Sequence, residues 1–535
     1  MQSPNINEIL KYLKDIKPRE YQEKIFQTCR EKNTLVILPT GLGKTLIALL
    51  LVIERQLKFP DNKILFLAPT RPLAEQHLNY FKKHLPEIFC QLELFTGKTP
   101  AEKRQELWQN ADVIFSTPQC ISNDLKNNLY NLNDVSLLIE DECHRCIKNY
   151  SYTYVAQKYK EQATNQRILG LTASPGHDKN NINQICKNLD IEAVEIRTRK
   201  SLDVMQYLKE LNFNIVKLDF PEEFKKIHEL IKIPFNKKIE ELKNRNLLFG
   251  PVNKITLLEC QHRIMKAIAS GNKHFNLLLG ASACAQALKL QHALELLETQ
   301  TLYSLDSYIS GLLKQADSNK SKAVRNLVKQ PEFVQARTKI TDLISKGIEH
   351  PKLFALKEIV SDELKSNKKI RILVFAQFRD TLIKICKELN SIKDVNAKVF
   401  VGQAKKGEGK NQSGLTQKEQ QQIIKEFSQG KINVLCASSI GEEGLDIPEV
   451  NAVIFYEPVP SAIRKIQRAG RTARLSNGKL IILLTKNTRD ESHHWSAFHK
   501  EKKMYKALEN IKDNLGNINS EKNQKNLQEF NTKNV

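Results

Sequence analysis

The sequence predicts an α/β protein in which two parallel-sheet domains are separated by an all-α insertion. Short apolar strands alternate with helical stretches before about residue 200 and again after about residue 350, a pattern typical of parallel sheets covered on both faces. The segment between them has helical periodicity and few β-branched runs. We therefore predict sheet domains at 1–200 and 347–500, a helical insertion at 201–346, and a polar, disordered tail at 501–535.

The composition is strongly basic, with 83 lysine and arginine residues against 60 acidic residues and a net charge of +23. A lysine-rich, AT-biased genome accounts for part of this excess. A chain this basic still accumulates on polyanions, so nucleic acid is the first partner to expect. No segment approaches the roughly 18 uncharged apolar residues of a membrane span, and the ten cysteines are scattered without paired spacings. These features predict a cytoplasmic protein with no membrane partner.

A polar stretch ahead of the first strand, Lys17-Pro-Arg-Glu-Tyr-Gln22, is a candidate adenine contact. A glutamine amide can pair with both N6 and N7 of adenine, so Gln22 is a candidate for selecting ATP. Arg19 belongs to the same candidate nucleotide contact. Taken alone, the stretch is equally well explained as a solvated helix start.

The first strand, at 34–38, runs into the glycine-rich turn Leu38-Pro-Thr-Gly-Leu-Gly-Lys-Thr45 and then into a helix. Such a turn aims backbone N–H groups at phosphate oxygens, helped by the positive end of the helix dipole. Lys44 is predicted to reach the β- and γ-phosphates of ATP, and the Thr45 hydroxyl to hold Mg²⁺. Leu38 stands where the usual pattern has glycine. The predicted cradle comprises Pro39, Thr40, Gly41, Leu42 and Gly43.

Three turns after later strands are candidate nucleic-acid contacts, because the carboxyl ends of parallel strands meet at one edge of a sheet. Each turn alone is more simply an ordinary β–α connection, but three on one edge favour phosphate binding. The strands predicted after the first lie at 63–68, 92–96, 113–116, 135–140, 167–172 and 193–196. The candidate contacts are Thr70 and Arg71, Thr96 and Gly97, and Thr117 and Pro118.

The run Leu137-Leu-Ile-Glu-Asp-Glu-Cys-His144 brings two adjacent acids to a strand end. Asp141 is predicted to hold Mg²⁺ through water, and Glu142 to orient and deprotonate the attacking water. Adjacent buried acids without a cation would be costly, which argues against a purely structural role. Cys143-His-Arg-Cys146 resembles half of a zinc site, but no second pair lies at finger spacing, so zinc is not expected.

The middle of the chain is predicted to form several long helices. Its apolar residues recur at spacings of three and four, which indicates one buried face per helix. Its lysines and arginines either contact backbone phosphates or form a solvated face, and for any single residue the solvated face is the simpler explanation. The apolar stripe is Ala283, Ala287, Leu290, Leu294 and Leu297, and the basic residues are Lys237, Lys238, Lys243, Arg245, Lys320, Lys322 and Arg325.

The second sheet carries no phosphate loop, so this half is not an ATPase by itself. Gln377, after its first strand, is a further candidate nucleic-acid contact. The glycine-punctuated stretch 438–446 suits close backbone approach to a ligand. In Gln467-Arg-Ala-Gly-Arg-Thr-Ala-Arg474, Arg471 and Arg474 suit the charge developing on a transferring γ-phosphate. An arginine-rich solvated helix is the alternative. The strands predicted here lie at 371–376, 395–401, 432–437, 452–456 and 479–484.

Taken in order, these stretches resemble the motifs of superfamily 2 helicases, and they are most similar to archaeal Hef and the Fanconi anaemia group M proteins. In that family Leu38 is tolerated in place of the first glycine, whereas Ala469 and Ala473 depart from its usual last motif. The motifs are Arg19–Gln22, Gly41–Thr45, Ala68–Arg71, Asp141–His144, Thr172–Ser174, Gly441–Asp446 and Gln467–Arg474. The closer match rests on Phe400–Gln403, Gly444–Val450, Phe455–Arg464 and His350–Leu353.

The resemblance implies two RecA-like domains that form an ATP- and Mg²⁺-dependent motor moving 3′ to 5′ on forked or branched DNA in repair and stalled-fork processing. It adds Gly444 and Asp446 as nucleotide contacts and Gln467 as a catalytic residue. No acidic nuclease cluster follows residue 500, so DNA cleavage is not expected. A double-stranded RNA helicase of the Dicer-like branch and a non-catalytic nucleic-acid clamp remain the alternatives. The sequence identifies no protein partner such as a sliding clamp.

Overall fold

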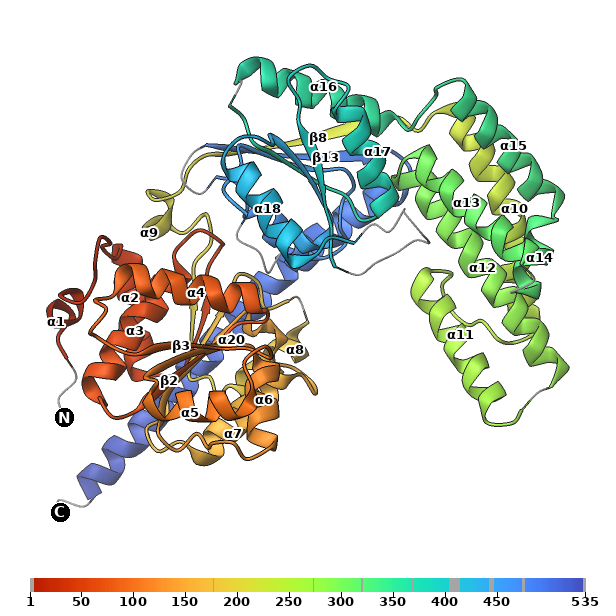
Figure 1. Ribbon diagram of the computed structural model, residues 1–535. Helices are drawn as coiled ribbons and strands as arrows, with labels where there is room; N and C mark the ends of the chain where they lie inside the picture. Colours follow the sequence, from red (N-terminus) through yellow and green to blue (C-terminus); the bar gives the residue numbers. More distant parts are fainter. Residues whose placement is uncertain are drawn as a thin grey trace.

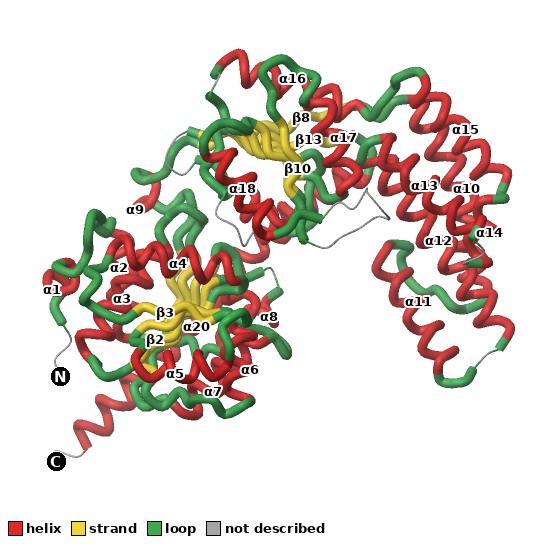
Figure 2. The backbone as a smooth tube through the Cα atoms, in the orientation of Figure 1, coloured by secondary structure: helices red, strands yellow, loops and turns green. Residues whose placement is uncertain are grey.

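The computed structural model consists of two sheet domains and a helical bundle (Figure 1). The first domain, in red and orange, lies below the second, and the bundle, in green, projects from the second domain. Figure 2 shows strands confined to the interiors of the two domains, with helices around them. The structure describes residues 4–176, 178–272, 274–318, 321–367, 369–403, 414–441, 447–473 and 477–532.

The first domain is built on a seven-stranded parallel sheet with the strand order β3-β4-β2-β5-β6-β1-β7. All seven strands were predicted from the sequence. Their bounds are β1 Thr34–Ile37, β2 Lys63–Leu67, β3 Leu92–Phe95, β4 Val113–Ser116, β5 Val135–Asp141, β6 Ile168–Thr172 and β7 Ala193–Ile196. The helices are α1 Ile6–Leu10, α2 Glu20–Glu31, α3 Lys44–Lys58, α4 Arg71–His84, α5 Ala101–Asn110, α6 Pro118–Lys126, α7 Ser151–Gln162 and α8 Lys179–Asn188.

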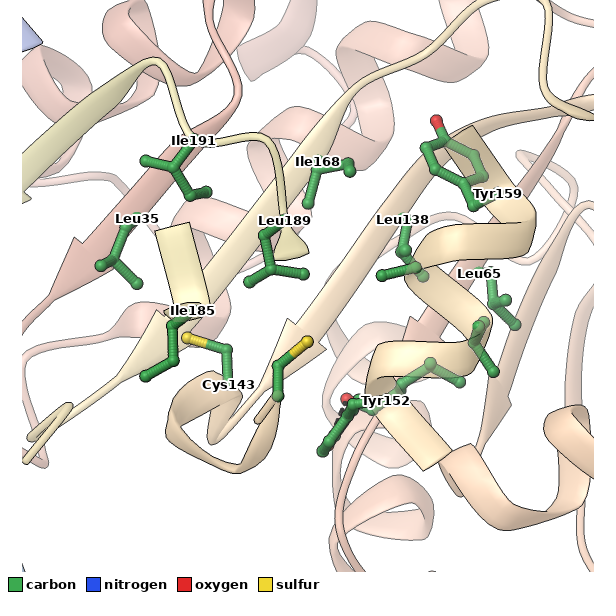
Figure 3. Packing of buried hydrophobic residues seen from close by; sticks show 14 of the residues in the cluster. Leu35, Leu65, Leu138, Cys143, Tyr152, Tyr159, Ile168, Ile185, Leu189 and Ile191 are labelled. Atoms are coloured by element: carbon green, nitrogen blue, oxygen red, sulfur yellow. Dashed lines mark hydrogen bonds between the residues drawn. The ribbon is translucent and has the colours of Figure 1, made fainter. Parts of the chain in front are cut away.

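Both faces of this sheet are buried, which explains why its central strands are continuously apolar. One face packs against α3 and α4, and the other packs against α7 and α8. Figure 3 shows the second face, where Leu138 of the sheet lies near Tyr159 of α7, and Leu35 lies near Ile185 of α8. Because helices pack on both faces, the carboxyl ends of the strands, where the predicted site residues lie, are held in fixed positions.

The second domain has a six-stranded sheet with the order β10-β11-β9-β12-β13-β8. Its edge strand β8, Leu211–Leu218, pairs in parallel with β13, Gly478–Thr485. Residues 211–218 were predicted to be part of the helical insertion, and that prediction is wrong. The other strands are β9 Ile372–Phe375, β10 Ala397–Phe400, β11 Val434–Ala437 and β12 Ala452–Phe455, and the helices include α16 Pro351–Ser366, α17 Arg379–Leu389, α18 Gln417–Ser428 and α19 Ala462–Ala469. The short helix α9, Leu202–Met205, precedes β8 but packs on the first domain, where Val204 is buried in the core.

The bundle has its own apolar core, in which the predicted stripe from Ala283 to Leu297 is buried. It is fixed to the second domain by polar contacts: Ser304 lies 2.9 Å from the Thr381 hydroxyl, and Thr381 Oγ1 donates to Gln300 Oε1 at 2.9 Å. Its helices are α10 Glu222–Asn244, α11 Lys254–Ala269, α12 Phe275–Thr299, α13 Leu302–Asp317, α14 Lys322–Val328 and α15 Pro331–Ser345.

The last helix, α20, Arg489–Thr532, joins the two sheet domains. It begins in the second domain, where Asp490 forms a buried ion pair with Lys352. It then passes α19, where Lys465 and Glu501 form a 2.9 Å ion pair. Farther along, it reaches the core of the first domain, so the predicted disordered tail from residue 501 is wrong for this segment. The docked residues are Met504, Ala507, Leu508 and Ile511.

Across the described ranges, no helix is long and apolar enough to cross a membrane.

Candidate ATP and nucleic-acid site between the sheet domains

The phosphate loop lies between the carboxyl end of β1 and the start of α3. Gly41 and Gly43 have φ angles of 85° and 74°, the left-handed region in which glycine is favoured. The Lys44 ammonium donates to the Leu38 carbonyl at 3.0 Å. The lysine side chain therefore folds back onto the loop, and its contact with ATP phosphates stays a prediction.

Helix α2 supports the phosphate loop from the side. Gln22 is 3 % exposed, and its Nε2 donates to the Leu42 carbonyl at 3.1 Å, while its Oε1 accepts from the Arg19 backbone at 2.8 Å. The Tyr21 hydroxyl donates to the same Leu42 carbonyl at 2.7 Å. A Cβ at Gly43 would lie 2.3 Å from Gln22 Nε2. Gln22 thus holds the loop in place, a role that the sequence did not indicate, and its adenine contact stays a prediction.

Glu142 has a strained backbone and an ionised side chain. Its φ of 52° is unusual for a residue with a side chain, and such strain clusters at functional sites. Burial alone would raise the pKa of Glu142, but the hydrogen bond to His144 and the nearby charges of His144, Lys44 and Arg145 lower it below its ordinary value. His144 Nδ1 lies 3.2 Å from Glu142 Oε2. A low pKa keeps this carboxylate charged, which a water-activating base requires.

Asp141, at the end of β5, is held at two points. His77 Nε2 lies 2.9 Å from Asp141 Oδ2, and the Tyr152 hydroxyl donates to the Asp141 backbone carbonyl at 2.6 Å. Neither His77 nor Tyr152 was identified from the sequence, because each lies on a helix far from the acidic pair in the chain. Within the described chain, no donor reaches Asp141 Oδ1.

The donor set fits Mg²⁺ better than zinc. Asp141 and Thr45 present oxygen atoms, the ligands Mg²⁺ prefers, and Mg²⁺ usually keeps several waters and binds phosphate oxygens as well. In the described ranges, no three His, Cys, Asp or Glu side chains converge as a metal site. Cys143 and Cys146 are both buried in the core of the first domain, and burial raises the pKa of each thiol. Figure 3 shows Cys143 among the apolar side chains of this core. The half zinc pattern is therefore core packing.

The last motif of the second domain contacts the phosphate loop directly. The Thr40 hydroxyl donates to the Gly470 carbonyl at 3.1 Å. A Cβ at Gly470 would lie 1.5 Å from Thr40 Oγ1, so only glycine allows this approach. Arg471 follows Gly470 in the chain, and its contact with ATP stays a prediction. Gln467 is 4 % exposed, and its Nε2 has no hydrogen-bond partner in the part of the chain that the structure describes.

Three predicted site residues, Gly444, Asp446 and Arg474, lie outside the described residues.

Ala473 has a φ of 55°, in the left-handed region that favours glycine. Ala473→Gly should raise the free energy of unfolding by about 0.5–1 kcal/mol, because glycine avoids the left-handed penalty but loses more chain entropy on folding. Urea unfolding measures this change. The matched control, Ala469→Gly at the end of α19, should lower the free energy of unfolding instead. Lower stability for Ala473→Gly would contradict the proposed strain.

A cavity of about 270 Å³ lies between the two domains and unites several predicted nucleic-acid contacts. Buried Arg71 Nε and Nη1 and Thr70 Oγ1 have no hydrogen-bond partner in the described chain. Buried donors of this kind normally have partners, and DNA phosphates would supply acceptors here. The lining residues are Arg71, Pro72, Thr96, Gly97, Lys98 and Thr117 of the first domain and Gln403, Gln417 and Gln420 of the second.

The remaining predicted contacts lie around this cavity or away from it. Thr117 and Pro118 begin α6 at its edge, whereas Gln377 is exposed and does not line the cavity. Lys98, Gln417 and Gln420 were not identified from the sequence, because none of them belongs to a recognisable motif.

Several basic residues of the bundle already have acidic partners. Lys237 pairs with Glu332 at 2.8 Å, and Arg245 pairs with Glu241 at 3.2 Å. These pairs support the solvated-face explanation for these residues.

Family models cover most of the chain in three segments. A DEAD/DEAH box helicase model matches residues 19–182, and a helicase conserved C-terminal domain model matches residues 352–476. Between them, the model "Putative ATP-dependent RNA helicase, helical bundle" matches residues 223–345.

Several relatives are similar to nearly the whole chain, and some are named as DNA helicases and others as RNA helicases. The chain is 39 % identical to "Putative ATP-dependent RNA helicase MJ1505" of Methanocaldococcus jannaschii, over 93 % of this chain and 61 % of that protein. It is 31 % identical to the Fanconi anemia group M protein homolog of Mus musculus (92 % and 26 %) and 30 % identical to ATP-dependent DNA helicase mph1 of Neurospora crassa (92 % and 43 %). The chain thus spans less than two thirds of each relative.

A solved structure matches the chain over nearly its full length. The Pyrococcus furiosus Hef helicase domain is 41 % identical with a TM-score of 0.69, and the match covers 90 % of this chain and 98 % of that one.

Proposed function

This chain belongs to the Hef and Fanconi anaemia group M family of superfamily 2 helicases, and from that premise we propose that it is an ATP-driven DNA helicase or translocase. We propose forked or branched DNA as its substrate, movement from 3′ to 5′, and a role in DNA repair and stalled-fork processing. The names of the mph1 relatives support DNA as the substrate.

The observation that carries the proposal is the contact between Thr40 and Gly470. The phosphate loop belongs to the first domain, and the last arginine motif belongs to the second, so a complete ATP site requires both. In the same arrangement of the domains, Arg71 of the first domain and Gln417 of the second line one cavity, which supports a nucleic-acid site shared by both domains. Nucleic acid in that cavity would stabilise the closed state, which supports ATP hydrolysis that depends on DNA.

The site residues have separable roles in this proposal. Lys44 binds the phosphates, and Glu142 orients the attacking water and accepts its proton. Thr45 and Asp141 would hold Mg²⁺, which neutralises phosphate charge when bound. Arg471 stabilises the charge that develops on the transferred phosphate.

Measuring ATPase activity with forked DNA, single-stranded DNA, duplex DNA and duplex RNA tests the proposal. Forked DNA should stimulate hydrolysis most. Greater stimulation by duplex RNA would replace the proposal with the RNA-helicase alternative. The names of the Methanocaldococcus relative and of the bundle model support that alternative. No stimulation by any nucleic acid, with ATP and DNA both bound, would favour the non-catalytic clamp.

Arg471→Ala should leave ATP bound to the first domain but reduce DNA-stimulated turnover by about 10³-fold or more, since an arginine finger acts mainly in the transition state. Steady-state ATPase assays and a nucleotide-binding titration measure the two effects. Arg371→Ala is the matched control, because Arg371 precedes β9 at the opposite end of the second sheet. Substantial stimulated turnover in Arg471→Ala would show that Arg471 is not the finger.

A further inference from the structure

Helix α4 connects the nucleic-acid cavity to the acidic pair. Its first residue, Arg71, lines the cavity, and its buried Nε and Nη1 have no partner in the described chain. Six residues later, His77 points to the other side of the site, with Nε2 2.9 Å from Asp141 Oδ2. One helix therefore carries both a buried donor without a partner at the cavity and a contact to the predicted Mg²⁺ ligand.

His77 is built into the fold at this position. It is 8 % exposed, and its ring centroid lies 4.5 Å from that of Phe66 on β2. The Asp141 backbone is held separately, by Tyr152 of α7. Among the described residues, His77 is the donor that orients the Asp141 side chain, and it leaves Oδ1 for another partner.

We propose that His77 is a positioning residue: it orients Asp141 for Mg²⁺ and, through α4, makes that orientation depend on nucleic acid bound at Arg71. This inference rests on the proposed function for its link to nucleic acid. Residues that hold a metal ligand in place typically affect metal affinity by about 10- to 100-fold when they are changed. The effect should therefore appear in Mg²⁺ affinity before it appears in nucleotide affinity.

The test uses the full chain and a non-hydrolysable fluorescent ATP analogue, titrated with Mg²⁺ in the presence and absence of forked DNA. His77→Leu should need about 10- to 100-fold more Mg²⁺ for half-maximal binding, and added DNA should no longer lower that requirement. His77→Gln should have a Mg²⁺ requirement close to that of the wild type, and DNA should again lower that requirement, because the glutamine amide can replace the imidazole donor. Binding measured in EDTA should be the same in all variants.

The matched control is His84→Leu. His84 lies on the same helix, is 6 % exposed, and contacts the Lys14 carbonyl at 2.9 Å instead of Asp141. A wild-type Mg²⁺ requirement in His77→Leu, or an equal change in His84→Leu, would overturn the proposal. If His77→Leu does not fold, His77→Asn, which is too short to reach Asp141, takes its place.

The two proposals can fail separately. A wild-type protein without nucleic-acid-stimulated ATPase activity would overturn the proposed function, whereas an altered Mg²⁺ requirement in His77→Leu would still support the link between His77 and Asp141. Stimulated wild-type activity with an unaltered His77→Leu would overturn only the role of His77.

Discussion

Glu142→Gln should bind ATP but hydrolyse it about 10²- to 10⁴-fold more slowly, because the amide keeps the shape of the side chain but cannot accept a proton from water. The wild-type carboxylate can accept that proton because it is charged at neutral pH, since its pKa lies below its ordinary value. Single-turnover hydrolysis and nucleotide binding separate chemistry from affinity. Collapse of ATP affinity instead would show that Glu142 is a binding residue.

Glu140 provides a matched control for this substitution. It lies two residues earlier, it is fully buried, and burial raises its pKa to about 8. Because this carboxyl group is protonated at neutral pH, Glu140→Gln replaces one neutral polar group with another of similar shape. Turnover in Glu140→Gln should therefore remain close to that of the wild type.

Lys44→Ala should reduce ATP turnover by about 10³-fold or more, because it removes a positive charge from the phosphates in the transition state. Nucleic-acid binding should be largely retained, because the proposed phosphate contacts lie in the cavity between the two domains, and Lys44 does not line it.

Steady-state ATPase and DNA-binding assays measure both outcomes for Lys44→Ala. Lys58→Ala, at the far end of α3, is the matched control. ATPase activity near the wild-type level in Lys44→Ala would remove the phosphate-loop assignment.

Sequence patterns correctly predicted the strands in the interiors of the domains, but they did not predict the elements at the edges. Buried parallel strands such as β5 are continuous apolar runs, so they stand out from the helices around them. The edge strand β8 is partly exposed, and its alternating Leu-Asn-Phe-Asn pattern lay between segments with helical periodicity. Helix α20 carries Met504, Leu508 and Ile511 at helical spacing, but its many asparagines and lysines favoured the prediction of disorder.

The phosphate loop and the acidic pair could be predicted because their chemistry depends on neighbours in the chain. His77 and Tyr152 could not, because their contacts to Asp141 arise only when α4 and α7 pack against the sheet. The support of the loop by Gln22 likewise depends on tertiary packing between α2 and the loop.

The docking of α20 also has a consequence for biosynthesis. Met504 and Leu508 complete the core of the first domain, yet the ribosome makes them after the entire second domain. Domains generally fold in order as the chain emerges. Here the domain that is translated first acquires its last core residues at the end of translation, so the nascent first domain exposes an apolar surface until then.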